Sequence, residues 1–111
     1  MVTYSRGDIV IASPKSNEGK PRPAIIIQAN WFNLGNPPSY IICLLSSDIY
    51  PELDFRPIIE PNNINKLTSS SQAMIDKIQV VKLAQISKKI GIIDKKNLQL
   101  INGNLKAILG L

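Results

Sequence analysis

The sequence contains no histidine and only one cysteine, Cys43. The absence of histidine removes the side chain that most often exchanges protons near neutral pH, and with it every Ser-His-Asp or Cys-His catalytic arrangement. A single cysteine without histidine also argues against a zinc site, and we expect neither a metal nor a cofactor. Because one cysteine cannot form an internal disulfide, the chain suits a reducing compartment. Any catalysis would depend on carboxylates, hydroxyls and fixed positive charge.

Long hydrophobic runs are also missing. No stretch approaches the roughly 18 apolar residues of a membrane span, and residues 1–8 lack the apolar core of a signal peptide. We therefore expect a cytoplasmic protein with no membrane partner. The 111 residues, 44% of them hydrophobic, predict one globular domain over 1–111 with a modest core.

The charge balance is basic. Thirteen basic residues against eight acidic ones give a net charge of +5 and a pI near 9.5. Such a balance favours a polyanionic partner, either nucleic acid or an acidic protein segment. The alternative is that the charge serves only solubility.

Short aliphatic runs bounded by Gly, Pro, Asn or Ser predict a series of β-strands. The predicted strands cover 8–12, 24–28 and 40–45, with a weaker one at 56–59 and one further bent or bulged strand over 73–75 and 78–81. Pro57 places the weak strand at an edge or a bulge. The runs are almost wholly apolar, as if buried on both faces, and a curled, barrel-like sheet would satisfy this pattern. Its outer face could be covered by a helix or by a partner subunit.

The apolar period changes to three and four near the C-terminus, which predicts a helix over 94–109. Asp94 is a suitable N-cap and Gly110 a suitable stop. A briefer helical turn is predicted at 83–86. Many strands followed by one good helix indicate a mainly β member of the α+β class. We interpret the apolar face of this last helix as core.

The sharpest chemical feature is Pro21-Arg22-Pro23, just before the second strand. A proline on each side restricts the backbone and favours an extended Arg22. The guanidinium group would then be rigidly mounted, with a geometry that suits a phosphate. The alternative is an ion pair between Arg22 and a nearby carboxylate, such as Asp8 or Glu18.

A second polar feature, Ser46-Ser47-Asp48, follows the third strand directly. Loops at strand ends often carry reactive side chains, and hydroxyls there could donate to a phosphate oxygen. The alternative is a polar turn that only ends the strand.

Together with the order of the other segments, these features resemble the MazF/PemK family of toxins. The resemblance is carried by 6–10 (RGDIV), 19–27 (GKPRPAIII), 43–47 (CLLSS), 75–78 (IDKI) and 88–91 (KKIG). No single segment is specific, but the ordered set spans nearly the whole chain.

This resemblance implies an SH3-like barrel of the CcdB/PemK/MazF type with a C-terminal helix. It implies a growth-inhibiting toxin of a toxin–antitoxin system that acts as a homodimer and is inhibited by a cognate antitoxin. The implied activity is sequence-selective, metal-independent endoribonuclease cleavage of single-stranded RNA or mRNA through attack by its own 2′-hydroxyl. Arg22 matches the arginine of the family's Arg-Pro motif. Ser46 matches the catalytic Ser/Thr that ends the third strand, with Ser47 as the alternative one residue later.

The proton acceptor is the least defined part of the implied site. Some family members carry a glutamate before the Arg-Pro motif, and Glu18 is the candidate here, although it stands one residue closer to Arg22. Asp76 is the second candidate. Either carboxylate could instead be an ordinary salt-bridge partner.

Several lysines could contact RNA. Lys15 and Lys20 flank the loop before the Arg-Pro motif and could lie along an RNA groove. Many relatives read Gln-Ile-Arg where this chain has Lys77-Ile78-Gln79, and Lys77 could replace the missing positive charge. We expect Asp76 and Ser47 among the RNA-contacting residues. The other lysines, Lys88, Lys89, Lys95, Lys96 and Lys106, are expected to form a solvated face.

Two further expectations can be tested by a structure. Trp31 and Phe32 are expected to anchor a loop to the core, although stacking on bases is the alternative. Cys43 is expected to be buried.

The functional alternative is a non-catalytic relative on the same scaffold, either a topoisomerase-poisoning toxin or a plain nucleic-acid-binding module.

Overall fold

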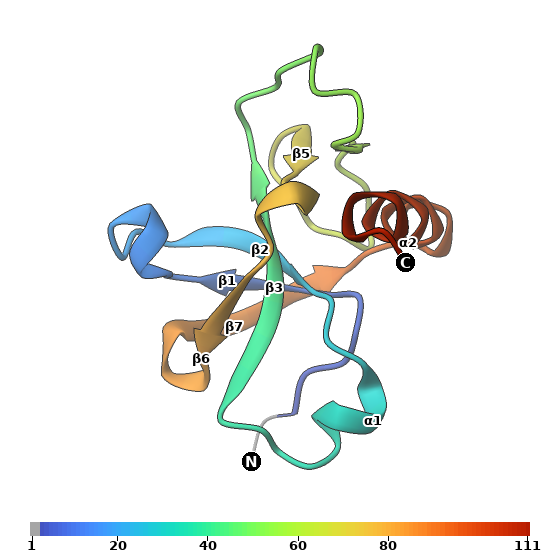
Figure 1. The fold of residues 1–111 in the computed structure, drawn as a ribbon. Helices are drawn as coiled ribbons and strands as arrows, with labels where there is room; N and C mark the ends of the chain where they lie inside the picture. The colour runs from blue at the N-terminus through green and yellow to red at the C-terminus, as the bar shows by residue number, and fades with distance from the viewer. Residues whose placement is uncertain (1–2) are drawn as a thin grey trace.

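A computed structural model describes residues 3–111, which fold into a curled antiparallel sheet and a C-terminal helix (Figure 1). The strands are β1 (Asp8–Ala12), β2 (Arg22–Ile26), β3 (Ser39–Ser46), β4 (Ile58–Ile59), β5 (Ser71–Ala73), β6 (Gln79–Lys82) and β7 (Ile86–Ile92). The helices are α1 (Asn30–Asn33) and α2 (Lys95–Leu109), with 3-10 turns η1 (Lys15–Asn17), η2 (Ile75–Lys77) and η3 (Leu83–Gln85).

The strand order is β4-β5-β3-β2-β1-β7, and β6 pairs with the other part of β3. Residues 39–44 of β3 pair with β6 and β2, whereas Leu45 and Ser46 pair with β5. β3 therefore passes from one part of the sheet into the other. The turn η3 joins β6 to β7, so the two ends of the curled sheet approach each other as a half-barrel (Figure 1).

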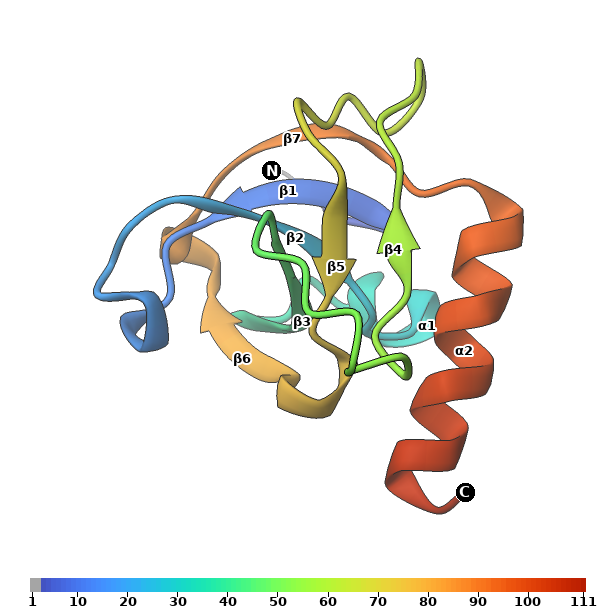
Figure 2. The same ribbon diagram turned by 90° about the horizontal axis from the view of Figure 1, so that it is seen from above.

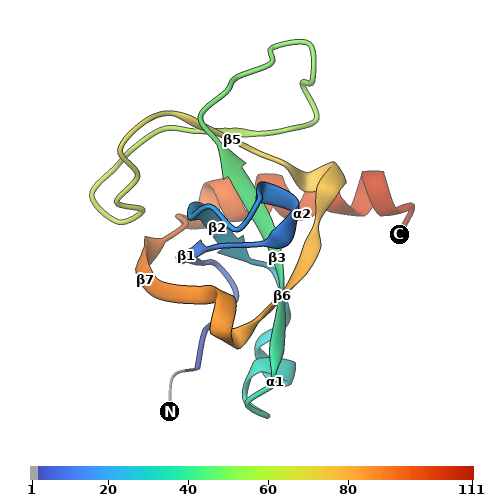
Figure 3. The same cartoon turned by 90° about the vertical axis from the view of Figure 1, so that its left-hand side faces the viewer.

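The strands β1, β2 and β3 bury most residues of both faces, as their sequences predict. Alternate residues of β3 enter two separate cores: Cys43 and Leu45 face one, and Ile42 and Leu44 face the other. The first core lies under α2, β4 and β5, and includes Ile101 of α2. The second is enclosed by the curl and includes residues of β6 and β7. Figures 2 and 3 show α2 on the side of the sheet away from β6.

The C-terminal helix begins and ends where the sequence predicts. The Asp94 carboxylate accepts a hydrogen bond of 3.2 Å from the Asn97 backbone N–H, and Gly110 adopts the left-handed conformation at φ 72°. Ile101 and Leu105 are buried, but Ile108 and Leu109 are about half exposed. The apolar face of α2 therefore extends beyond the core, contrary to our interpretation. Neither helix within residues 3–111 has the length and apolarity needed to cross a membrane.

Several sequence predictions need correction. The segment over 73–81 is two strands, because η2 separates β5 from β6. The long strand β7 was not predicted, because its exposed Ser87-Lys88-Lys89 stretch breaks the apolar pattern that indicates a strand. Bulges also interrupt its pairing with β1. Trp31 and Phe32 do not anchor a loop to the core. They lie on α1 with 77% and 50% of their surfaces exposed and contact each other edge to face.

Other local predictions are confirmed. Cys43 is fully buried, and burial raises the pKa of its thiol to about 12. The strand that follows Pro57 lies at the sheet edge, paired only through β5. The short turn after β6 is present as η3.

Candidate functional site

The site begins where β2 starts and β3 ends. The β2–β3 register pairs Ala24 with Leu44. Arg22 stands two residues before Ala24 on β2, and Ser46 two residues after Leu44 on β3. These two side chains line one surface pocket of about 380 Å³. The antiparallel arrangement thus brings together two residues that are far apart in the sequence.

Arg22 is the first residue of β2 and pairs with Ala12 of β1. Its flanking prolines keep the backbone extended, as the sequence predicts. The carboxylates that could have neutralised Arg22 pair elsewhere: Asp8 lies 3.2 Å from Lys89 Nζ, and Glu18 lies 3.7 Å from Lys20 Nζ. Within residues 3–111 no carboxylate forms an ion pair with Arg22, so its charge can act on a ligand.

Ser46 is only 7% exposed and lies at the point where β3 crosses from β2 to β5. The backbone N–H of Asp48 donates to Ser46 Oγ over 3.1 Å. This hydrogen bond fixes the oxygen and leaves the hydroxyl proton available to donate. A fixed hydroxyl in one pocket with a guanidinium group whose backbone is restrained suits an anionic group.

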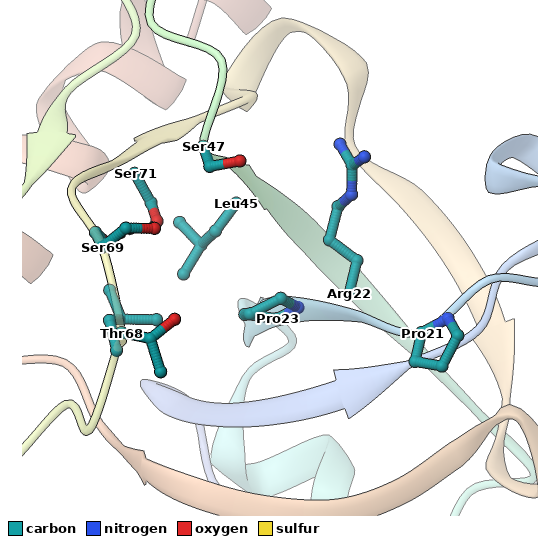
Figure 4. Close-up of a pocket in the computed structure, with 9 residues that line it drawn as sticks. Pro21, Arg22, Pro23, Leu45, Ser47, Thr68, Ser69 and Ser71 are labelled. Atoms are coloured by element: carbon teal, nitrogen blue, oxygen red, sulfur yellow. Dashed lines mark hydrogen bonds between the residues drawn. The ribbon is translucent and has the colours of Figure 1, made fainter.

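A second, smaller pocket of about 230 Å³ lies on the other side of Arg22. Figure 4 shows Arg22 and Ser47 on one side of this hollow and Thr68, Ser69 and Ser71 on the opposite side. Besides Arg22, its walls consist of four hydroxyl-bearing residues and four apolar ones, Pro23 among them. Arg22 therefore separates two hollows, and the alternative serine, Ser47, faces the smaller one.

The structure places the remaining predicted residues in different regions. Lys77 lines the larger pocket with Arg22 and Ser46. Glu18 and Lys20 are exposed on the loop between β1 and β2 and line neither pocket beside Arg22. Lys15 lines a separate hollow.

Asp76 is held by a residue that our sequence analysis did not select. Its two carboxylate oxygens accept hydrogen bonds of 2.7 Å and 3.0 Å from Nε and Nη2 of Arg56. These hydrogen bonds hold the pKa of Asp76 below its usual value. A carboxylate with a lowered pKa is a weak base near neutral pH. The interpretation of Asp76 as a salt-bridge partner therefore gains support.

Arg56 lines the larger pocket, and so does Tyr50. Both lie on the loop between β3 and β4, which the sequence analysis did not connect with Ser46. The side chain of the buried Gln72 holds this loop, because its Nε2 lies 3.1 Å from the Tyr50 carbonyl and 3.2 Å from that of Arg56. Twenty residues separate Arg56 from Asp76, so no local pattern could have indicated their pairing.

The chemistry of the larger pocket is that of an anion site. Three cationic side chains line it, from Arg22, Arg56 and Lys77, together with the hydroxyl of Ser46 and a single carboxylate, that of Asp48, so positive charge predominates. Nowhere in residues 3–111 do three His, Cys, Asp or Glu side chains gather as metal ligands. The groups present can bind a phosphodiester and stabilise negative charge on its oxygens.

A profile of the PemK-like, MazF-like toxins of type II toxin–antitoxin systems matches residues 5–109. The chain belongs to this toxin family. A MazF protein of Mycolicibacterium smegmatis, named a probable endoribonuclease, is 30% identical over 107 residues, which are 96% of each chain.

Solved structures of MazF proteins have the same fold. An endoribonuclease from Mycobacterial species, in complex with its cognate antitoxin, matches with a TM-score of 0.79 and 18% identity over 100% of this chain and 97% of the other. MazF from Deinococcus radiodurans matches with a TM-score of 0.78 and 18% identity over the full length of both chains. The predicted mainly β barrel with a C-terminal helix is thereby confirmed for this PemK/MazF toxin.

Proposed function

We propose that this toxin is an endoribonuclease that cleaves single-stranded RNA, including mRNA, at selected sequences and without a metal. The observation that carries the proposal is the pocket that Arg22 and Ser46 share at the start of β2 and the end of β3. The endoribonuclease name of the M. smegmatis relative supports it. A binder would need positive charge, but it would have no need for a guanidinium group and a fixed hydroxyl in one pocket.

The proposed reaction uses the RNA's own 2′-hydroxyl. Its oxygen bonds to the adjacent phosphorus while the bond from phosphorus to the 5′-oxygen breaks, which leaves a 2′,3′-cyclic phosphate and a free 5′-hydroxyl. Extra negative charge develops on the phosphoryl oxygens in the transition state. Arg22 and Ser46 would stabilise this charge, and rigid donors of this kind are commonly worth on the order of 3–4 kcal/mol each. DNA lacks the 2′-hydroxyl and would not be cut.

The proton of the 2′-hydroxyl must be accepted, and the 5′-oxygen must gain one. Arg22 is a poor base because a guanidinium group already carries its proton near neutral pH, and it could instead donate to the leaving oxygen. Glu18 remains our first candidate for the acceptor, on the loop that leads into Arg22. Asp76 is the weaker candidate because Arg56 occupies both of its oxygens.

The proposed partners are single-stranded RNA, a second copy of the chain and a cognate antitoxin. A MazF-like endoribonuclease of similar fold has been solved with its antitoxin. The net charge of +5 favours an acidic, partly disordered antitoxin that folds on binding. A homodimer would cover exposed apolar side chains, such as Ile108 and Leu109. An mRNA substrate places the activity in the cytoplasm.

Cleavage of a mixed-sequence RNA by the purified protein, with a chelator present, tests the proposal. We expect discrete fragments that end in a cyclic phosphate. Arg22→Ala should lower kcat by about 10²–10³ and abolish growth arrest on expression. Lys95→Ala, which removes an exposed positive charge at the start of α2, is the matched control and should cut normally.

Two results would count against the assignment. RNA that is shifted but uncut by the wild-type protein would favour the non-catalytic alternative, either a nucleic-acid-binding module or a topoisomerase-poisoning toxin. A folded Arg22→Ala variant that cuts at the wild-type rate would remove Arg22 from the mechanism. The oligomeric state can be measured separately from the mass in solution at micromolar concentration.

A further inference from the structure

The ion pair between Arg56 and Asp76 uses only part of the guanidinium group. Nε and Nη2 of Arg56 donate to the two oxygens of Asp76, side by side. No residue in the range 3–111 accepts a hydrogen bond from the third nitrogen, Nη1. Nor does that range contain a buried side-chain nitrogen without a partner. Nη1 therefore reaches solvent, although Arg56 as a whole is only 7% exposed.

Arg56 lines the larger pocket, which is the hollow into which Nη1 can open. The charged and hydroxyl side chains that share its wall are those of Arg22, Ser46, Lys77 and Asp48. The two guanidinium groups enter from different elements, Arg22 from β2 and Arg56 from the loop before β4. A ligand that contacts both would lie across the pocket.

Arg56 is held more firmly than an ordinary surface arginine. Asp76 fixes the plane of its guanidinium group, and Gln72 Nε2 holds the backbone by hydrogen bonding to the Arg56 carbonyl. Gln72 is itself 1% exposed and also binds the loop at Tyr50 and Leu53. Donors fixed in this way lose little conformational entropy when a ligand binds.

We propose that Arg56 binds a phosphate of the RNA through Nη1, and that Asp76 is the positioning residue that sets its orientation. This inference rests on the proposed function, since it assigns a further contact to the same substrate. Lys77 would add charge at the same wall. Asp76 would then act through Arg56, and its assignment as an RNA-contacting residue would become indirect.

The salt dependence of RNA binding measures how many phosphates the protein contacts. For single strands, each contact contributes about 0.7 to the negative slope of log K against log salt. The probe is a mixed-sequence RNA with a methyl group on every 2′-oxygen, which cannot be cut by the proposed reaction. Its Kd is measured between 50 and 200 mM salt for the wild type and two double variants.

Arg56→Gln with Asp76→Asn replaces the ion pair by two neutral amides that can still hydrogen-bond each other. We expect the slope to fall by about 0.7, so that the wild type loses roughly 2.6-fold more affinity than the variant over this salt range. The matched control is Lys89→Gln with Asp8→Asn, which neutralises an ion pair at 3.2 Å between β7 and β1, outside the pocket. Its slope should equal that of the wild type.

Two single variants test the positioning role and provide readouts if the double variant does not fold. Arg56→Lys keeps the charge but loses the planar fork, and Asp76→Asn keeps Arg56 but releases one of its anchors. Both should keep the wild-type slope and lower kcat for cleavable RNA several-fold. A purely structural pair would leave kcat unchanged in folded variants, and that result would overturn the positioning role.

An unchanged slope in the folded Arg56→Gln/Asp76→Asn protein would overturn the phosphate contact. An equal fall in both double variants would also overturn it, because general charge would then explain the effect. Failure of the proposed function would be distinguishable from failure of this inference. A wild-type protein that binds the probe but does not cut ordinary RNA would not be a nuclease, yet the salt dependence of its binding would still test the Arg56 contact.

Discussion

Replacing Gly91 with alanine should destabilise the fold sharply, because β7 crosses the loop between β4 and β5 at this residue. A Cβ added there would lie against the carbonyl oxygen of Ile64 and 2.6 Å from that of Asn65. Both obstacles are backbone atoms. The Ile64 oxygen already accepts a hydrogen bond from the Ile92 N–H over 2.9 Å, so it cannot withdraw without losing that bond.

The loop has little freedom to move away. Asn65 is fully buried, and its side chain donates to the Glu60 carbonyl over 2.8 Å and accepts from the Leu67 N–H over 3.0 Å. Overpacking of this kind typically costs about 1–3 kcal/mol. With an unfolding entropy of about 2.1 cal/mol/K per residue, each kcal/mol corresponds to about 4 °C in a chain of this length. We therefore expect Tm to fall by about 4–13 °C.

Thermal unfolding followed by circular dichroism measures this change. Gly103→Ala is the matched control, since the same added methyl group meets nothing within 4 Å on α2. Alanine is favoured over glycine in a helix interior by about 0.8–1.0 kcal/mol, so the control should raise Tm by about 4 °C. A Gly91→Ala protein with unchanged or higher Tm would refute the close approach of β7 to this loop.

Two other predictions follow from buried or capping groups. Burial raises the pKa of Asp94, but hydrogen bonds from the side chain and backbone of Asn97 lower it by more than burial raises it. The net pKa therefore lies below 3.8. Its capping contribution is thus present above pH 3.8 and lost as the pH falls through the folded value, so Asp94→Ala should cost about 1 kcal/mol at pH 7 and progressively less as the pH falls below 3.8 in denaturant titrations. Burial raises the pKa of the Cys43 thiol to about 12, so a thiol reagent should label it at pH 8 only after unfolding; rapid labelling of the native protein would contradict its place in the core.

Local physical signals were sufficient for much of the fold. β1 and β3 consist of short aliphatic runs, and the structure has them within one residue of the predicted ends. The helix α2 follows from its apolar period, its aspartate cap and its terminal glycine. β7 was missed because its stability comes from pairing with β1 and from packing under the loop at Gly91, and neither partner is visible in its own residues.

Local patterns in the sequence likewise indicate some residues of the candidate site but not others. Arg22 and Ser46 could be proposed because each stands in a local pattern, a proline-flanked arginine and a hydroxyl at a strand end. Arg56 could not, because its function depends on Asp76 and on the loop that Gln72 holds. The apolar Trp31 suggested a core anchor, but it lies on a surface helix with 77% of its surface exposed.

By itself the sequence determined the secondary structure that is stabilised locally, the toxin family and the two residues on which the proposed chemistry depends. Propensity, capping and backbone restriction act between near neighbours, so they can be read from the order of residues. Only the tertiary structure decided that β3 crosses between two parts of the sheet, and that Arg22, Ser46 and Arg56 line one pocket. These relations depend on strand register and on contacts between distant segments, which no local pattern specifies.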